Sequence, residues 1–154
     1  MQKFFQGDFM TQEQISDTLE IQRLVGKFSN LEGNSAEQKN FLTRDVQFRI
    51  YMGEELFLEI GGIMNFEKSL RPVFGAIKRC HYLNGQHVID FLTKDTATGL
   101  LFCRAVHITE EDGHEVITNH CIYCEDIYEK KNGKWLIKGR DAHYFISDKH
   151  ALGF

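Results

Sequence analysis

The sequence lacks long apolar runs and a surplus of positive charge. It has only one proline, so a proline-rich linker is absent. No apolar run approaches the roughly 20 residues that a membrane helix needs, and the first residues lack the apolar stretch of a signal peptide. We therefore expect a cytoplasmic chain without membrane contact. Its 18 Lys and Arg residues are scattered among 22 Asp and Glu residues, which disfavours nucleic-acid partners. Without repeats or low-complexity tracts, residues 1–154 are expected to form a single domain.

Metal and disulfide signatures are also weak, although the chain has four cysteines. Cys121 and Cys124 are three residues apart in a pattern typical of a strand. Side chains at that spacing point to opposite faces of a strand and cannot clasp one ion. We therefore expect free, buried thiols rather than metal ligands or a disulfide.

Apolar residues at intervals of three and four predict a long amphipathic helix near the N-terminus. It is expected to begin near Thr11 and to end by Gly33, with an apolar stripe of Ile15, Leu19, Ile21, Leu24, Val25, Phe28 and Leu31. Glu32 follows Phe28 by four residues and so falls beside the buried stripe. An exposed carboxylate at a frayed helix end is the alternative for Glu32.

Two further helices are expected. The pair Ser35 and Gln38 has the spacing of a capping box and opens a short helix that reaches about Leu42. Asn65 can cap the next helix, and Pro72 predicts a kink or a break within it. The apolar stripe of this helix is Phe66, Leu70, Phe74 and Ile77.

The remaining segments have the period-two pattern of strands. Strands are expected at residues 46–51, 56–60, 86–93 and 135–145, with two long strands between residues 98 and 131. Asp112-Gly113 and Asn132-Gly133 carry hairpin-turn chemistry. Helices followed by an antiparallel meander predict an α+β fold in which a curved sheet wraps around the N-terminal helices.

The strand that begins near Thr98 is apolar on both faces. Leu101, Cys103, Ala105 and His107 share one face, whereas Leu100, Phe102, Arg104 and Val106 share the other. We expect helices to bury one face and a second subunit to bury the other. His107 ends the face of small residues, which suggests a pocket at its rim.

Several segments in order resemble one family. The helix ending in Phe28 and Glu32, together with residues 49–51, 80–85, 99–107 and 128–135, is similar to the SnoaL-like branch of the NTF2-like superfamily, and most specifically to the scytalone dehydratases. The resemblance covers nearly the whole chain. It implies a cone-shaped α+β half-barrel that encloses a pocket for a small apolar organic ligand. It also implies a homodimer formed through the outer sheet face.

The resemblance further implies a set of catalytic residues. The two pocket histidines fall on His81 and His107, with one residue more between them than in the relatives. Tyr51 falls on a tyrosine that helps to hold a catalytic water. Glu32 falls on the aspartate that orients a histidine.

The chain departs from the family pattern at three pocket positions. Leu31 stands where the relatives have a second water-holding tyrosine, and Ile122 and Cys124 stand where they have polar substrate anchors. His120 shares the strand face of Ile122 and Cys124 and is a further pocket candidate. The expected lining also includes Phe28, Cys103 and Ala105.

Dehydration of a β-hydroxy carbonyl compound fits this set of residues. A histidine can accept and return a proton near neutral pH, so His107 is expected to act as the base and Glu32 to fix its tautomer. Tyr51 would polarise the carbonyl, and His81 would bind the leaving oxygen. The leading hypothesis is a cofactor-independent lyase or isomerase acting on a small apolar cyclic or polyketide-like hydroxy-ketone, with dehydration preferred.

The sequence also allows other functions. A ligand-binding module of the same fold would need no catalysis, and a protein that acts only through dimerisation is a further class. Two histidines with a carboxylate could hold a metal, although the relatives work without one. Steroid isomerase chemistry ranks below dehydration because the chain lacks residues at those family positions.

The polar residues outside the predicted pocket are given structural roles. Asp126 and Arg140 are expected to form a structural ion pair, and Trp135 and Phe102 to be core or interface residues. The histidines expected on the surface are His87, His114, His143 and His150.

Overall fold

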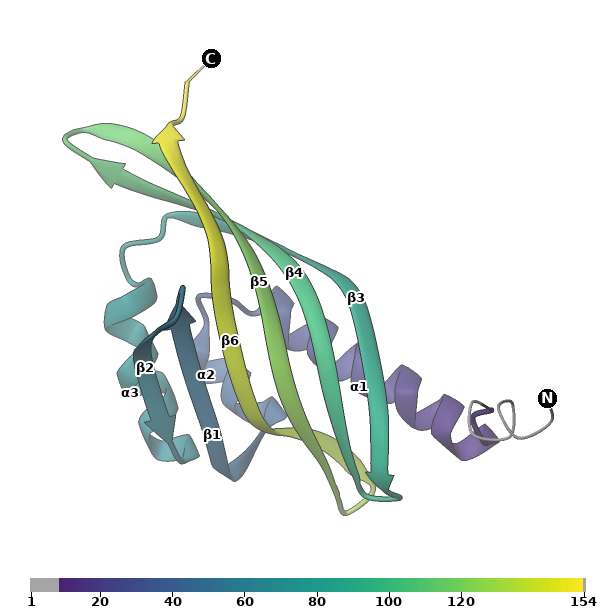
Figure 1. Cartoon of the computed structure of the whole chain (residues 1–154). Helices are drawn as coiled ribbons and strands as arrows, with labels where there is room; N and C mark the ends of the chain where they lie inside the picture. Colours follow the sequence, from purple (N-terminus) through teal and green to yellow (C-terminus); the bar gives the residue numbers. More distant parts are fainter. Residues whose placement is uncertain (1–8, 154) are drawn as a thin grey trace.

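In the computed structural model, which describes residues 9–153, one curved sheet wraps around the helices, giving the expected α+β fold (Figure 1). The helical elements are α1 (Gln12–Asn30), α2 (Ser35–Gln38), a 3-10 turn η1 (Lys39–Phe41) and α3 (Ile63–Phe74). The strands are β1 (Leu42–Met52), β2 (Glu55–Gly61), β3 (Arg79–Thr93), β4 (Thr96–Glu111), β5 (His114–Lys131) and β6 (Lys134–Ala151). None of the described helices is long and apolar enough to span a membrane.

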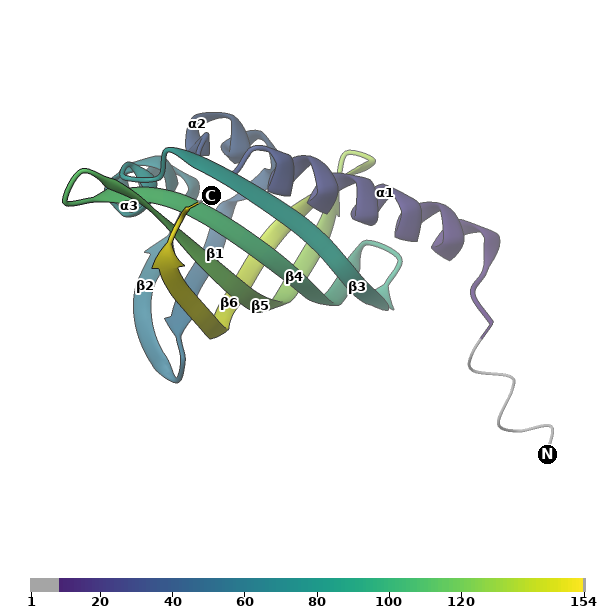
Figure 2. The ribbon, with the colours of Figure 1, turned by 90° about the horizontal axis from the view of Figure 1, so that it is seen from above.

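The six strands form one sheet in the order β2-β1-β6-β5-β4-β3. All neighbouring pairs are antiparallel except β1 and β6, which run parallel, so the sheet is mixed rather than purely antiparallel. The expected hairpin turns are confirmed, since Asp112 and Asn132 have positive φ angles of 50° and 51°. Seen from above, the sheet curves and α1 crosses its concave side (Figure 2).

Helix α1 follows the sequence prediction closely. Thr11 caps it in a complete capping box with Gln14, and the chain turns away at Gly33, whose φ of 89° suits glycine. The next helix is capped one residue before the predicted position, because the Asn34 side chain accepts a hydrogen bond from the Glu37 amide.

The predictions for α3 need correction. Gly62, rather than Asn65, occupies its N-cap, and Ile77 lies beyond its end at Phe74. Pro72 neither breaks the helix nor splits it, because it lies in the last turn, where few further backbone hydrogen bonds remain to be lost.

Strand β3 begins seven residues earlier than predicted, at Arg79 instead of Gln86. Its pairing with β4 shifts between Asn84 and His87, at the position of Gly85. A bulge that contains glycine allows the strand to bend without ending, which a sequence pattern reads as a loop.

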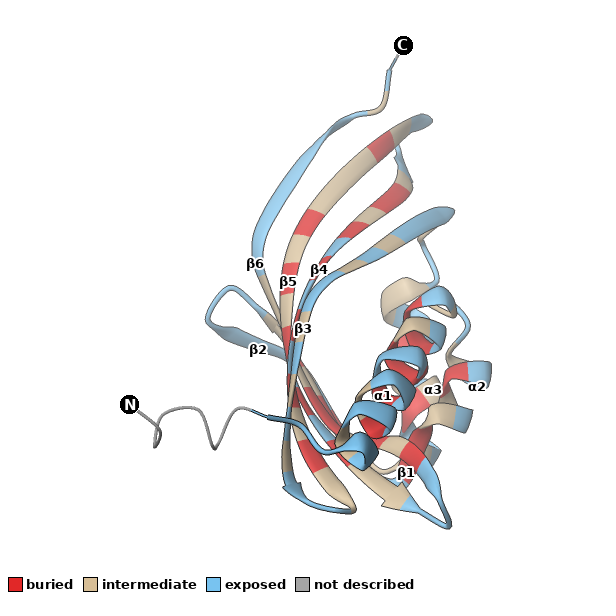
Figure 3. Cartoon of the chain, turned by 90° about the vertical axis from the view of Figure 1, so that its right-hand side faces the viewer, coloured by how far each residue is buried: buried red, intermediate tan, exposed pale blue. Residues whose placement is uncertain are grey.

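The core lies between the concave sheet face and the helices (Figure 3). Leu101, Cys103, Ala105 and His107 of β4 all face it and are buried, as their alternation predicted. On the outer face of the single chain, Leu100 and Phe102 each remain 41% exposed. The fold therefore gives β4 one covered face and one free face.

Gly99 is expected to be essential for the packing of Tyr128. A Cβ atom at Gly99 would lie 2.7 Å from Cε2 of the fully buried Tyr128 ring. We expect Gly99→Ala to lower the free energy of unfolding by roughly 1–3 kcal/mol, as overpacking does, measured by urea denaturation. Gly26→Ala is the control, because a Cβ at Gly26 meets nothing within 4 Å. Equal stability of the two variants would contradict this account of Gly99.

Candidate active site

A largely apolar cavity lies between the concave sheet face, α1 and α3. Its empty space is about 480 Å³ when the open solvent at its mouth is included, and the narrow interior accounts for only about 30 Å³. Its walls are formed by Phe28, Ser29, Glu32, Gln38, Phe48, Ile50, Phe66, Leu70, Phe74, Tyr82, Leu101, Cys103, Ile122, Cys124, Arg140, Ala142 and Tyr144. An adjoining, more open hollow shares Glu32, Phe74 and Tyr82 with the cavity and reaches His107.

Glu32 brings a carboxyl group into this apolar space. It follows the C-cap of α1, and although the residue as a whole is only half-buried, it lines the cavity. Burial raises the pKa of Glu32 to about 7, and the nearby Arg140 charge and a hydrogen bond with Gln38 oppose this rise. Near neutral pH, Glu32 can therefore both accept and return a proton.

The buried His107 is held by a tyrosine rather than by Glu32. Its Nε2 atom lies 2.8 Å from the hydroxyl of Tyr82, and no hydrogen bond joins it to Glu32 within residues 9–153. Burial, and then the charge of His120, lower the pKa of His107 to about 4. His107 is thus a neutral ring at pH 7, suited to fixing the Tyr82 hydroxyl.

Two phenols stand beside Glu32 in the cavity. Burial, followed by the charge of Glu32, raises the pKa values of Tyr82 and Tyr144, so both stay protonated. A hydrogen bond between the two phenols also contributes to the pKa shifts of both. The site therefore combines one titratable carboxyl group with two hydrogen-bond donors.

His120 extends this cluster, as its strand face predicted. It is buried, and its Nδ1 atom lies 2.7 Å from Oγ of Ser147. Its ring centroid lies 5.0 Å from those of His107 and Tyr144. Burial lowers the pKa of His120.

The structure does not bring His81 or Tyr51 to the cavity. His81 is exposed, because alternation along β3 turns Tyr82 inward and His81 outward. Tyr82 rather than His81 is therefore the residue of this strand that lines the cavity. Tyr51 points to the outer sheet face, where its ring stacks on His143 at 4.6 Å.

The predicted apolar lining is largely present. Phe28, Cys103, Ile122 and Cys124 line the cavity. Ala105 is fully buried on the same face of β4 but does not reach the lining, and Leu31 forms the C-cap of α1 instead. Ile122 and Cys124 therefore form part of the cavity wall, whereas Leu31 ends a helix.

The cysteines lie on different faces, as predicted for a strand. Cys124 is buried on the concave face of β5, whereas Cys121 is half-buried on the other face. Cys103 is buried as expected, but Cys80 is exposed and Cys121 only half-buried, so the expectation of four buried thiols is wrong for these two.

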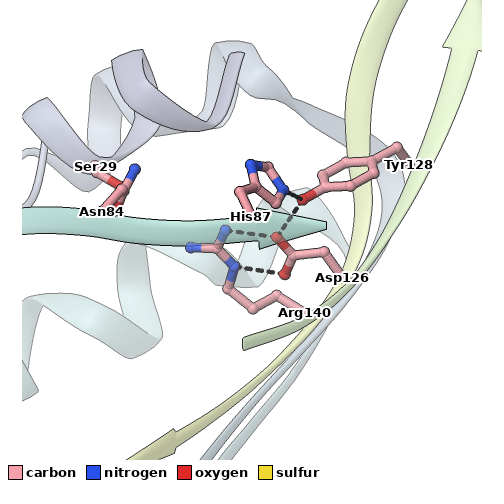
Figure 4. Close-up of polar contacts among 6 residues, drawn as sticks. All are labelled: Ser29, Asn84, His87, Asp126, Tyr128 and Arg140. Carbon is pink, nitrogen blue, oxygen red and sulfur yellow. Dashed lines mark hydrogen bonds and ion pairs between the residues drawn. The ribbon is translucent and has the colours of Figure 1, made fainter. Parts of the chain in front are cut away.

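A largely buried polar network reaches the cavity wall at Arg140 (Figure 4). Arg140 Nε and Nη2 donate to the two carboxylate oxygens of Asp126 at 2.8 and 2.7 Å, which confirms the predicted ion pair. The Tyr128 hydroxyl donates to Asp126 at 2.6 Å and lies 2.9 Å from His87 Nε2. The prediction of a surface His87 is wrong, because the β3 bulge turns it inward.

Pattern analysis missed Tyr82 and Tyr144 and gave Arg140 only a structural role. The pocket role was assigned to His81, so the neighbouring Tyr82 was not considered. Strand alternation from Arg140 would have placed Tyr144 on the concave face. In the structure, the Tyr82 ring lies beside His107 and the Tyr144 ring lies beside His120, which makes both tyrosines part of the site.

A curved sheet that encloses an apolar cavity against helices, with a polar cluster inside it, defines a cavity-bearing α+β protein. The chain belongs to the SnoaL-like domain family of the NTF2-like superfamily, which it matches over residues 13–141. No curated protein sequence matches it.

Solved structures share this fold at low sequence identity. A protein of Novosphingobium aromaticivorans DSM 12444 described as a "Putative Scytalone Dehydratase" is 16% identical, with 94% of each chain covered and a TM-score of 0.75. LinA is 14% identical, with 92% of each chain covered and a TM-score of 0.72. The hexachlorocyclohexane dehydrochlorinase LinA-type3 of Novosphingobium barchaimii LL02 is 11% identical over 92% of this chain and 93% of its own, with a TM-score of 0.74.

The low pKa of His107 makes stability depend on pH in a defined direction. Between pH 6.5 and 4 the unfolded chain binds a proton at this ring that the folded chain does not, so folding weakens as the pH falls. Relative to His107→Gln, the wild type should lose on the order of 2 kcal/mol of unfolding free energy across this range. Urea denaturation at several pH values measures the difference. A difference that stays constant with pH would show that His107 titrates normally.

Proposed function

We propose that this chain is a cofactor-independent lyase that removes water from a small, largely apolar cyclic or polyketide-like hydroxy-ketone. One observation carries the proposal. Glu32, with a pKa of about 7, lines an otherwise mostly apolar cavity together with two protonated phenols. A general acid or base works best when its pKa lies near the working pH.

The elimination can be written with Glu32 as the only group that changes its protonation state. The Glu32 carboxylate accepts the proton from the carbon next to the carbonyl, and the C–H electron pair moves toward the carbonyl oxygen as an enolate. The enolate re-forms the carbonyl and expels the β-hydroxyl with its C–O electron pair. The Glu32 carboxylic acid then returns its proton, and water leaves beside an enone.

The phenols are assigned to the departing oxygen. Tyr82 and Tyr144 line the same cavity as Glu32, and both remain protonated at neutral pH. A donor placed where charge develops stabilises the transition state without rearranging. His107 positions Tyr82 through the 2.8 Å hydrogen bond, in the neutral tautomer whose Nε2–H donates to the Tyr82 oxygen and leaves the Tyr82 proton for the departing oxygen.

This assignment revises the roles expected from the sequence. Glu32 rather than His107 is the proton carrier, because the pKa of His107 is about 4 and that of Glu32 is about 7. Tyr82 and Tyr144 take the role at the leaving oxygen that was expected for His81, and neither takes the carbonyl-polarising role that was expected for Tyr51. The substrate class stays the same.

The similar structures support an elimination reaction as the class of chemistry. The name dehydratase denotes loss of water, and the name dehydrochlorinase denotes loss of hydrogen chloride. Both reactions require a base for a carbon-bound proton and a leaving group on the neighbouring carbon. The cavity offers such a base in Glu32, and among residues 9–153 the other charged group in its wall is the paired Arg140.

A ligand-binding module is the second candidate. Ile122 and Cys124 make the wall of β5 apolar, and the narrow interior suits an apolar ligand held without reaction. Binding of such ligands that is indifferent to Glu32, with no turnover, would favour this candidate.

The Glu32→Gln variant tests the lyase directly. With 3-hydroxycyclohexanone among a panel of β-hydroxy ketones, formation of the enone is followed by its ultraviolet absorbance. Loss of a general base is expected to slow the reaction about 10²- to 10⁴-fold. The wild-type rate should rise with pH through about 7 as Glu32 ionises.

Glu37→Gln is the matched control, because Glu37 is exposed in the neighbouring helix α2 and lies outside the cavity. It should leave the rate unchanged. A Glu32→Gln protein that dehydrates as fast as the wild type would rule out this mechanism.

The outer sheet face is proposed to pair with a second copy of the chain. Its exposed apolar side chains include Leu83, Leu100, Phe102, Ile127 and Phe145. Large exposed apolar patches are typical of interaction surfaces. We expect the wild type to sediment as a dimer and Phe102→Lys to shift it toward the monomer. Leu19→Lys on the exposed side of α1, where Leu19 is 62% exposed, should not do so. Sedimentation of the wild type as a monomer would contradict this interface.

A further inference from the structure

Arg140 has an unused donor at the wall of the cavity. Its side chain is only 5% exposed, and it lines the cavity wall. Nε and Nη2 are both engaged by Asp126, whereas Nη1 makes no hydrogen bond to any residue between 9 and 153. Figure 4 shows this third nitrogen pointing away from Asp126. Among the described residues, the fully enclosed side-chain atoms without a partner are Thr18 Oγ1, Thr43 Oγ1 and Glu129 Oε2. Nη1 therefore still borders open space.

The guanidinium group is held rigidly in this position. Asp126 grips it with two hydrogen bonds and is itself fixed by Tyr128, which contacts His87. On another side, the Phe28 ring centroid lies 5.2 Å from the Arg140 Cζ atom. A buried group fixed on several sides has lost its freedom before any ligand arrives, which is the condition for a preorganised donor.

We propose that Arg140 Nη1 binds the carbonyl oxygen of the substrate, and that this contact selects neutral ring ketones. The inference deepens the proposed lyase function and rests on it for the identity of the reaction. Nη1 supplies the polar anchor that Ile122 and Cys124 do not, since both present apolar side chains to the same cavity.

The charge balance of the site explains why a neutral oxygen is selected. Asp126, itself buried and in contact with Arg140, already offsets the guanidinium charge. A carboxylate ligand would add an uncompensated negative charge to an apolar cavity that also holds Glu32, at a large desolvation cost. A ketone oxygen accepts the hydrogen bond and brings no charge.

The same placement suits the reaction. When Glu32 takes the α-proton, its negative charge passes to the substrate oxygen, so the total charge in the cavity does not change. A hydrogen bond from Arg140 strengthens as that oxygen becomes an enolate. Arg140 and Glu32 line one cavity, and they are near enough for the Arg140 charge to lower the pKa of Glu32.

A matched pair of ligands tests the anchor without any reaction. Cyclohexanone and methylenecyclohexane have nearly the same shape, but only the ketone accepts a hydrogen bond, and neither has a β-hydroxyl to eliminate. Their dissociation constants are measured by NMR titration with the wild type and with Arg140→Met/Asp126→Asn. This double variant removes both charges and leaves an acceptor for Tyr128. We expect the ketone-to-alkene ratio of dissociation constants to rise about 10- to 100-fold in the variant, the range for a hydrogen bond to a charged group.

A second measurement applies even if the double variant does not fold. In the wild type, the ¹⁵N and ¹H signals of the Arg140 Nη1 group should shift on adding cyclohexanone and not on adding methylenecyclohexane. An unchanged ratio of dissociation constants, or Arg140 signals that ignore the ketone, would overturn the proposal. Tighter binding of benzoate than of cyclohexanone would overturn the selection of neutral ligands.

These outcomes are separate from the fate of the lyase proposal. Ketone binding at Arg140 is measured on a compound that cannot lose water, so it can succeed while Glu32→Gln proves fully active. Conversely, enone formation that depends on Glu32 can occur in a protein whose Arg140 signals ignore cyclohexanone.

Discussion

Removal of ionisable groups from water is the constraint on which this structure depends. The curved sheet and the helices close around a narrow space, and every polar group inside must find a partner or change its charge. Glu32 changes its charge, with a pKa raised to about 7. His107 is neutral at pH 7 and shares a hydrogen bond with Tyr82. Arg140 keeps its charge because Asp126 is beside it.

The charge states of Glu32, His107 and Arg140 give the side chains around the cavity different chemical abilities. An ionisable carboxyl group can move a proton, protonated phenols can donate hydrogen bonds, and a fixed guanidinium can hold an oxygen. A buried ion pair is weak evidence for stability, because the cost of removing both charges from water can exceed their attraction. The ion pair is therefore no measure of stability, and of its two members Arg140 alone lies in the cavity wall.

Sequence patterns predicted the fold because its signals are local and repeated. The apolar stripe of α1, the alternation along β4 and the Asp-Gly and Asn-Gly turns each act over a few residues. The parallel pairing of β1 with β6 could not be read in this way, since the two strands are far apart in the chain. The sequence pattern and the family resemblance led only to the expectation of an antiparallel sheet, so this parallel pairing was not predicted.

The site was harder to predict because one residue of offset reverses a strand face. Placing His81 and Tyr51 in the pocket required the correct phase of β3 and β1, and in both strands the phase is the opposite one. His87 required knowledge of the bulge after Asn84. His107, His120 and Glu32 were found because alternation or helical spacing from clearly buried neighbours determines their faces.

Burial raises the pKa of Glu32 to about 7, and the proposed lyase depends on this shift. A ¹³C NMR titration of the Glu32 carboxyl group in the unliganded wild type tests it most directly. The account predicts a single transition at about pH 7. A transition near pH 4.5, the ordinary value for a glutamate side chain, would contradict it.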